Sequence, residues 1–186
     1  CLPRASKRGQ RHIFSDLARA LLADRHSLPS YDMGEADKAY TELLGLFSHE
    51  YFHAWNVKSI KPAVFAPYNL DQANYSEHLW AFEGITSYYD DLFLARSKTI
   101  SPEAYLTLLA QSITRVQQTQ GRLKQTLAQS SFSAWDKFYK QDENSPNAIV
   151  SYYQKGALAA LCLDLIIREK SQGKYNLDSV MQQHYR

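Results

Sequence analysis

Residues 49–53 read His-Glu-Tyr-Phe-His and are the strongest candidates for chemistry in this sequence. The apolar residues around them repeat at helical spacing, so His49 and His53 are expected one turn apart on the same side of a helix. Two imidazoles in this arrangement can bind one metal ion, and Glu50 would project beside it as a base for a water molecule. A helix surface that carries two ordinary histidines is the alternative. The pattern is typical of zinc hydrolases, and the rest of the chain decides between the two interpretations.

A catalytic zinc ion usually takes three protein ligands and keeps a fourth position open, which requires one more ligand elsewhere in the chain. Glu83 lies in the apolar stretch Leu79-Trp-Ala-Phe-Glu-Gly-Ile-Thr86, where an unpaired carboxylate is costly to bury. A metal held by the two histidines is a suitable partner, whereas an exposed helix glutamate is the alternative. Ser87, Asp90 and Asp91 continue its face and are candidates to orient a ligand histidine, whereas aspartates that face solvent are the alternative.

Helical periodicity dominates the rest of the chain, and strand signals are few. One helix is predicted from about Asp37 to Val57, with Gly45 inside it, and a second from about Ser76 to Ser97. Shorter helices are predicted within residues 122–140. Further helix starts carry a capping residue or a proline, and they are Ser101-Pro102, Ser151, and Asn176 or Asp178. Residues 1–19 show no clear period, apart from an apolar patch that begins at Leu17. The predicted fold class is mainly α.

The composition is that of a globular protein, with 45% hydrophobic and 22% charged residues among 186. The 21 Lys and Arg against 19 Asp and Glu leave a charge of +2, too even to indicate nucleic acid or an anionic membrane as partner. No apolar run is predicted to span a bilayer and no signal peptide is recognised, so a cytoplasmic protein without membrane insertion is expected. Cys1 and Cys162 indicate no disulfide framework, and Cys162 is expected to be buried.

Four segments together resemble the glycyl-aminopeptidase family of zinc metallopeptidases, in which a PDZ domain usually follows the catalytic domain. The segments are Ser48–Val57, Leu79–Asp91, Ser130–Trp135 and Ser151–Gly156. The family belongs to the thermolysin-like group, in which a glutamate on a downstream helix is the third zinc ligand. The resemblance therefore implies a helical thermolysin-like domain whose His-Glu-x-x-His helix packs on the helix of the glutamate ligand. It implies Zn²⁺ held by His49, His53 and Glu83, with Glu50 as the base.

The last of these segments adds a second catalytic candidate. Its Tyr-Gln-Lys-Gly resembles the Tyr-Glu-Lys-Gly of related aminopeptidases, in which the tyrosine hydroxyl stabilises the oxyanion. The resemblance gives this role to Tyr153, whereas Tyr152 is expected to be a packed aromatic residue. A phenol hydroxyl is a suitable donor to a carbonyl oxygen that gains negative charge.

Two parts of the family's usual architecture have no counterpart in this sequence: a β-rich domain with a glycine-rich segment before the catalytic region, and the PDZ domain after it. Residues 1–186 are expected to form a single catalytic domain in which residues 1–19 are irregular or diverged. The expected function is zinc-dependent, aminopeptidase-like hydrolysis of peptides or proteins. The alternatives are a catalytically impaired module that binds peptides or partners, and a zinc hydrolase of a non-peptide substrate. The residues indicate no oligomeric state.

Overall fold

The structure is a computed structural model, and it describes residues 36–67 and 69–185. Within these ranges the chain forms helices, turns and loops, with one isolated bridge between Asn56 and Ile60 and no β-strand. The mainly α fold expected from the sequence is therefore confirmed. The predictions for residues 1–19 and for the apolar patch from Leu17 to Leu22 lie outside the described residues.

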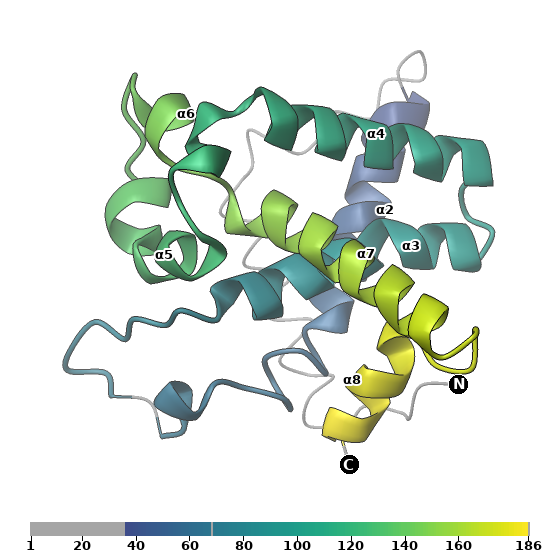
Figure 1. The fold of residues 1–186 in the computed structure, drawn as a ribbon, viewed down its shortest axis with the longest axis horizontal. Coiled ribbons are helices and arrows are strands. Elements are labelled where there is room, and N and C mark those ends of the chain that lie inside the picture. The colour runs from purple at the N-terminus through teal and green to yellow at the C-terminus, as the bar shows by residue number, and fades with distance from the viewer. Residues whose placement is uncertain (1–35, 68, 186) are drawn as a thin grey trace.

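Figure 1 shows α7 crossing the middle of the molecule, with α4 on one side of it and α8 near the chain end. Helices named η are 3₁₀-helices, except η2 and η4, which are π-helices. The elements, in chain order, are α2 (Ala36–Phe52), η1 (Ala63–Phe65), η2 (Trp80–Gly84), α3 (Ile85–Arg96), α4 (Pro102–Gln118), η3 (Gln120–Leu123), α5 (Leu127–Phe132), η4 (Ala134–Phe138), α6 (Ser145–Ala148), α7 (Tyr152–Lys170) and α8 (Leu177–Tyr185).

Several helices start where the sequence predicts a capping residue. Ser101, Ser151 and Asn176 each accept a hydrogen bond from the backbone amide three residues later, at donor–acceptor distances of 3.1, 3.3 and 3.1 Å. These bonds satisfy amides in the first turn that have no partner within the helix. The side chains at these positions therefore set the starts of α4, α7 and α8.

The first predicted helix ends at Phe52, earlier than the predicted end at Val57. The backbone amide of His53 still donates to the carbonyl of His49 at 3.3 Å, so the last helical turn reaches the second histidine. Val57 then adopts a φ of 119°, which is unusual for a β-branched residue, and its amide donates to the carbonyl of Ile60 at 2.8 Å. The chain thus turns away directly behind the two histidines.

The second helix also differs from its prediction, which placed the start at about Ser76. It begins at Trp80 as a π-helix and becomes an α-helix at Ile85. A π-helix closes its hydrogen bonds over five residues instead of four and shifts the faces of its side chains. Glu83 lies within this π-helical turn. Its direction could therefore not be derived from the 3.6-residue period of the sequence.

The core lies where α2, α3, α7 and α8 meet. Its buried residues are Phe52, Ala54, Trp55, Tyr88, Tyr89, Ala160, Leu177 and Met181. The rings of Phe52 and Tyr89 stack with centroids 4.7 Å apart, which joins α2 to α3. This aromatic contact holds the end of α2, and with it the histidines, against the helix that follows Glu83.

Only one side of α7 enters this core. Ala160 and Asp164 are buried, whereas Leu163, Leu165 and Ile166 are between 41% and 55% exposed. The apolar sequence of Ala157–Ile167 by itself predicts a buried run, and this prediction is wrong for part of its length. Cys162 is exposed as well, and the prediction of a buried cysteine is wrong, because it lies on the side of α7 that carries the exposed Leu165 and Ile166 one turn later.

One stretch of the described chain, Ser145–Lys170, is long and apolar enough to cross a membrane by length and composition. By that criterion, the prediction that no apolar run is long enough is wrong. Core helices of globular proteins meet the same criterion, and α7 packs against η2 and α3. Extended backbone at Ile149 and Ser151 also separates α6 from α7 inside this stretch.

Candidate metal centre and active site

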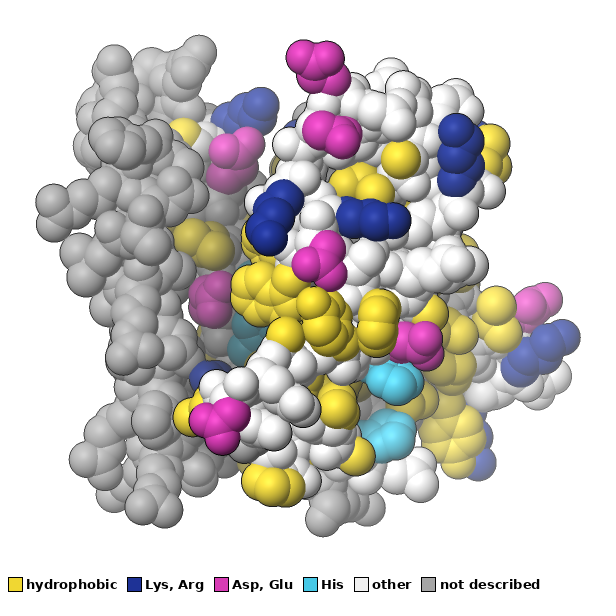
Figure 2. All heavy atoms as spheres, turned by 90° about the vertical axis from the view of Figure 1, so that its left-hand side faces the viewer, with side chains coloured by type: hydrophobic (Ala, Val, Ile, Leu, Met, Phe, Trp, Pro, Cys, Tyr) yellow, Lys and Arg dark blue, Asp and Glu magenta, His cyan; other side chains and the backbone are white. Residues whose placement is uncertain are grey.

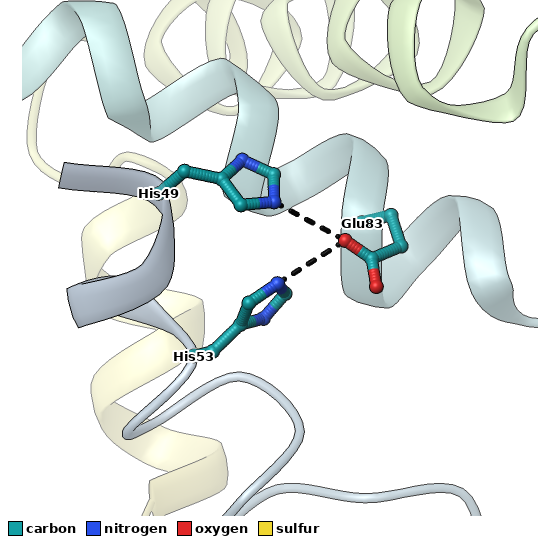
Figure 3. A group of neighbouring side chains, drawn as sticks. All are labelled: His49, His53 and Glu83. Atoms are coloured by element: carbon teal, nitrogen blue, oxygen red, sulfur yellow. Dashed lines mark hydrogen bonds and ion pairs between the residues drawn. The ribbon is translucent and has the colours of Figure 1, made fainter. Parts of the chain in front are cut away.

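Three side chains that could bind a metal come together from two packed elements, the end of α2 and the π-helix η2. Figure 3 shows the rings of His49 and His53 pointing toward the carboxylate of Glu83. The Glu83 Oε2 atom lies 3.2 Å from His49 Nε2 and 3.1 Å from His53 Nε2. One ligand atom of each residue lies within 4.8 Å of the others. The structure thus brings together the three residues that the sequence proposes as ligands.

These distances can be compared with the requirements of zinc. Two ligand atoms at about 2.0–2.1 Å from a tetrahedral zinc ion lie roughly 3.3 Å from each other. The two separations between carboxylate oxygen and imidazole nitrogen are close to this value. Two imidazole nitrogens and one carboxylate oxygen are also a donor set found in catalytic zinc sites. The residues present therefore fit a zinc ion.

The ring of His49 is oriented by Asp90, whose Oδ2 atom lies 3.2 Å from its Nδ1. Because an ionised carboxylate only accepts hydrogen bonds, Nδ1 carries the proton, and in the neutral ring Nε2 is left with a free lone pair. The sequence suggested Ser87, Asp90 or Asp91 for this role, and Asp90 is the residue that makes the contact. Such a partner fixes the ring of a metal ligand and increases its basicity.

The ring of His53 is oriented by the backbone of the turn that follows it. Its Nδ1 donates to the carbonyl oxygen of Asn56 at 2.9 Å. Nε2 therefore faces Glu83 with its lone pair in the neutral ring. Sequence reasoning missed this contact, because it depends on the turn that replaces the predicted continuation of the helix.

The pKa values of the site residues depend on their contacts with one another. Burial opposes the charged form of His49, but hydrogen bonds to Asp90 and Glu83 outweigh it and raise the pKa of the imidazole to about 9. Burial likewise opposes the ionised form of Glu83, but hydrogen bonds from His49 and His53 lower the pKa of its carboxyl to about 2. The pKa of Asp90 is raised, because burial outweighs its contact with His49. The ionised form of Glu83 is thus stabilised by the hydrogen bonds that it accepts from the two imidazoles.

The three residues line a pocket of about 250 Å³ together with Glu50, Val57, Lys58 and Tyr153. The carboxylate of Glu50, which is not among the candidate ligands, and the hydroxyl of Tyr153 therefore line the same pocket as the candidate ligand atoms. The ring centroid of Tyr153 lies 6.2 Å from that of His49. Burial, helped by the negative charge of Glu83, raises the pKa of the Tyr153 hydroxyl, so that this group keeps its proton as a donor.

Tyr152 does not line this pocket and is 1% exposed, as expected for a packed aromatic residue. Its ring stacks on that of Tyr153 with centroids 4.6 Å apart. The hydroxyl of Tyr139 lies 3.2 Å from that of Tyr152 and 3.3 Å from that of Tyr153. Tyr139 is a neighbour of the candidate donor that sequence reasoning missed, because it lies in an irregular part of the chain.

Tyr139 also belongs to an aromatic surface. Figure 2 shows the side of the molecule that carries α5 and α6, where hydrophobic side chains gather across the middle of the face. The aromatic residues Phe132, Trp135 and Tyr139, in α5, in η4 and directly after η4, are exposed, and the rings of the last two stack with centroids 5.4 Å apart. The candidate active site therefore borders an apolar part of the surface.

Two glycines hold α7 against η2. A Cβ atom on Gly84 would lie 2.6 Å from the Cα atom of Gly156, closer than real side chains approach a backbone. From the sequence alone, a glycine directly after Glu83 predicts a close crossing with the His-Glu-x-x-His helix, and this prediction is wrong, since the close neighbour of Gly84 is α7. The contact has a consequence for the site, because Glu83 precedes one glycine and Tyr153 lies one turn before the other.

A glycine inside a helix can admit another backbone, and the sequence makes Gly45 a candidate for such a contact in α2. A Cβ atom there would instead meet a side-chain oxygen, Oδ1 of Asp91 in α3, at 3.4 Å. The expectation is therefore wrong in the kind of neighbour. The glycine leaves room for a carboxylate beside Asp90.

Two adjacent serines of α5 connect the elements of the site. The Ser131 hydroxyl oxygen accepts a hydrogen bond from the backbone amide of Trp80 at 2.9 Å, at the start of η2. The Ser130 hydroxyl donates to the carbonyl of Val150, just before α7. Both serines are buried. The segment was quoted for its family resemblance alone, and its role as an anchor requires the tertiary structure.

Comparison with known proteins shows the family to which the chain belongs. A model of the M61 glycyl aminopeptidase family matches residues 42–159. The chain belongs to this family, so the family resemblance found in the sequence is confirmed. The roles of individual residues as ligands, base and donor stay predictions.

The chain is also similar to a solved structure, an aminopeptidase N family protein from Idiomarina loihiensis. The two are 47% identical with a TM-score of 0.79, and the match covers 84% of this chain and 26% of that chain. This sequence thus spans about a quarter of the length of that protein. No curated protein matches the chain at a significant level.

Proposed function

We propose that this chain is the catalytic part of a zinc-dependent peptidase with aminopeptidase-like activity. One observation carries the proposal: the ligand atoms of His49, His53 and Glu83 converge in a pocket that Glu50 and Tyr153 also line. Membership of the M61 glycyl aminopeptidase family supports peptides as the substrate class.

The three ligand candidates would hold zinc, and Asp90 and the Asn56 carbonyl would keep the two imidazoles in place. When bound, zinc supplies a Lewis acid that polarises a substrate carbonyl and lowers the pKa of a water molecule toward about 7. Because both Nδ1 atoms have acceptors, both Nε2 lone pairs remain available for the metal.

Glu50 and Tyr153 would move and hold protons. The Glu50 carboxylate takes a proton from the attacking water and returns it to the nitrogen of the leaving amine. The Tyr153 hydroxyl donates a hydrogen bond to the carbonyl oxygen as negative charge develops on it. No serine or cysteine nucleophile is needed, and the exposed Cys162 has no part in this chemistry.

The proposal is tested by zinc content and peptide cleavage on the same preparation. We expect about one zinc per chain, as for a single three-ligand site. We also expect a peptide with a free N-terminal glycine to be cleaved faster than its N-acetylated form. A chelator should stop cleavage and added zinc should restore it. A chain that binds zinc and peptide without cleaving either peptide would instead be a binding module, and the proposed reaction would be wrong.

The oxyanion role of Tyr153 predicts a selective loss of turnover. Tyr153→Phe removes one hydroxyl and keeps the ring stacked on Tyr152, so fold and zinc content should survive. Loss of an oxyanion donor should lower kcat about a hundredfold, or roughly 3 kcal/mol, with a much smaller change in KM. Steady-state kinetics on one peptide measures both constants.

Tyr152→Phe is the matched control, because its hydroxyl contacts Tyr139 and does not line the pocket. Its effect on kcat should be mild. If the two variants exchange their behaviour, Tyr152 is the donor. If both are mild, another group stabilises the oxyanion.

A further inference from the structure

Asn56 contacts both halves of the candidate metal site. It lies in the turn after His53 and is 3% exposed. Its side-chain nitrogen donates toward three oxygen atoms of the neighbouring helix: the Ala81 carbonyl at 3.1 Å, the Phe82 carbonyl at 3.0 Å and the Thr86 hydroxyl at 3.2 Å. A buried amide with this many acceptors is held in one orientation.

The acceptors lie in the helix that carries Glu83. Ala81 and Phe82 belong to the π-helical turn of η2, whose hydrogen bonds depart from the α-helical pattern. The Asn56 amide adds donors from another element to the two carbonyls of this turn. The Thr86 hydroxyl donates a further bond to the Phe82 carbonyl at 2.5 Å.

The same residue also holds the histidine. The side-chain amide of Asn56 donates hydrogen bonds to η2, and its backbone carbonyl accepts the hydrogen bond from His53 Nδ1 at 2.9 Å. The Phe82 carbonyl belongs to the peptide bond that joins Phe82 to Glu83. Asn56 is therefore in direct contact with His53. It also contacts Phe82, the residue that directly precedes Glu83.

We propose that Asn56 is a positioning residue that fixes the spacing between His53 and Glu83 and so sets the metal affinity of the site. This inference rests on the proposed zinc site. The two ligands come from elements that the chain connects only through the long segment of residues 57–79. Asn56 spans that gap directly, and the 3.1 Å separation of the two ligand atoms depends on it.

The test replaces the side-chain amide of Asn56 with a carboxylate, which has nearly the same shape. Asn56→Asp puts an oxygen where the donor nitrogen lies, opposite two carbonyls that can only accept. Zinc affinity is measured on the 186-residue chain by competition with a chromophoric chelator, with circular dichroism to show that the chain is folded. We expect affinity to fall by about ten- to a hundredfold, as for other residues that orient metal ligands. The absorption spectrum of the Co²⁺-substituted chain should change as well.

Tyr88→Phe is the matched control for lost stability. It removes a buried hydrogen bond, from the Tyr88 hydroxyl to Asp164 at 2.9 Å, that has no contact with the site. This variant should lower the melting temperature without a change in zinc affinity or Co²⁺ spectrum. A merely structural role for Asn56 would give the Asn56→Asp variant the same behaviour.

Wild-type zinc affinity in folded Asn56→Asp overturns the inference. Should that variant not fold, Thr86→Val keeps the shape and removes one acceptor of the amide together with its bond to Phe82. A severalfold loss of affinity is then expected, and unchanged affinity again overturns the inference. If the unaltered chain binds no zinc, the proposed function fails too, whereas equal binding by all variants removes only the role of Asn56.

Discussion

Replacing Glu50 with glutamine is expected to lower turnover by about a hundredfold or more while zinc stays bound. The amide has nearly the same shape as the carboxylate but cannot take a proton from water at neutral pH. Glu50 lines the pocket without being among the three converging ligand candidates, so the loss should fall on the reaction and leave metal binding intact. The measurement pairs kcat with zinc content on one preparation of the protein.

Glu42→Gln is the matched control for this experiment. It makes the same change on the same helix, at an exposed residue that lies outside the pocket of the candidate ligands. Its kcat should equal that of the unaltered chain. Near-normal turnover in Glu50→Gln would show that another group accepts the proton, and a loss of zinc from this variant would make Glu50 a ligand instead.

The parts of this site that could be predicted from the sequence are the ones set by local geometry. His49 and His53 are four residues apart, and an α-helix places residues at this spacing on one face, whether it ends at Phe52 or at Val57. The caps at Ser101, Ser151 and Asn176 act within one turn of their own position, so they too can be recognised in the sequence. Membership of the peptidase family followed from short segments of this local kind.

The parts that could not be predicted depend on contacts between distant segments. The π-helical turn around Glu83 has no signature in the apolar period, and it is stabilised by Asn56 and Ser131 from other elements. The period likewise made Ser87, Asp90 and Asp91 equivalent, and only the crossing of α2 over α3 selects Asp90. The pairing of Gly84 with α7 arises in the same way.

The exposed side of α7 illustrates another limit. Leu163, Leu165 and Ile166 are apolar, and composition alone assigned them to the core. A leucine-rich helix can be covered by neighbours on all sides or on one side only. Its apolar content does not distinguish the two cases. Which side is covered depends on where η2 and α3 pack, and here they pack on the side of Gly156 and Ala160.

Removing either histidine should abolish tight zinc binding. His49→Ala and His53→Ala each leave two protein ligands where a catalytic zinc site uses three. They also withdraw positive charge or hydrogen bonding from Glu83, whose ionised form is stabilised by both rings. Glu83→Gln should weaken binding because it removes the negative charge, and Glu83→Ala should weaken it more because it also removes the donor atom. Chelator competition measures all four variants on one scale.

His78→Ala is the control, since this histidine is exposed and lies outside the pocket. Zinc binding should be unchanged in this variant. Wild-type stoichiometry and affinity in both His49→Ala and His53→Ala would show that the metal does not bind where these side chains converge. If only the Glu83 variants keep full affinity, the two histidines remain ligands and the third must be another carboxylate. Asp90 is the next carboxylate to replace, and His49 would then bind the metal through Nδ1, the atom that lies 3.2 Å from Asp90 Oδ2.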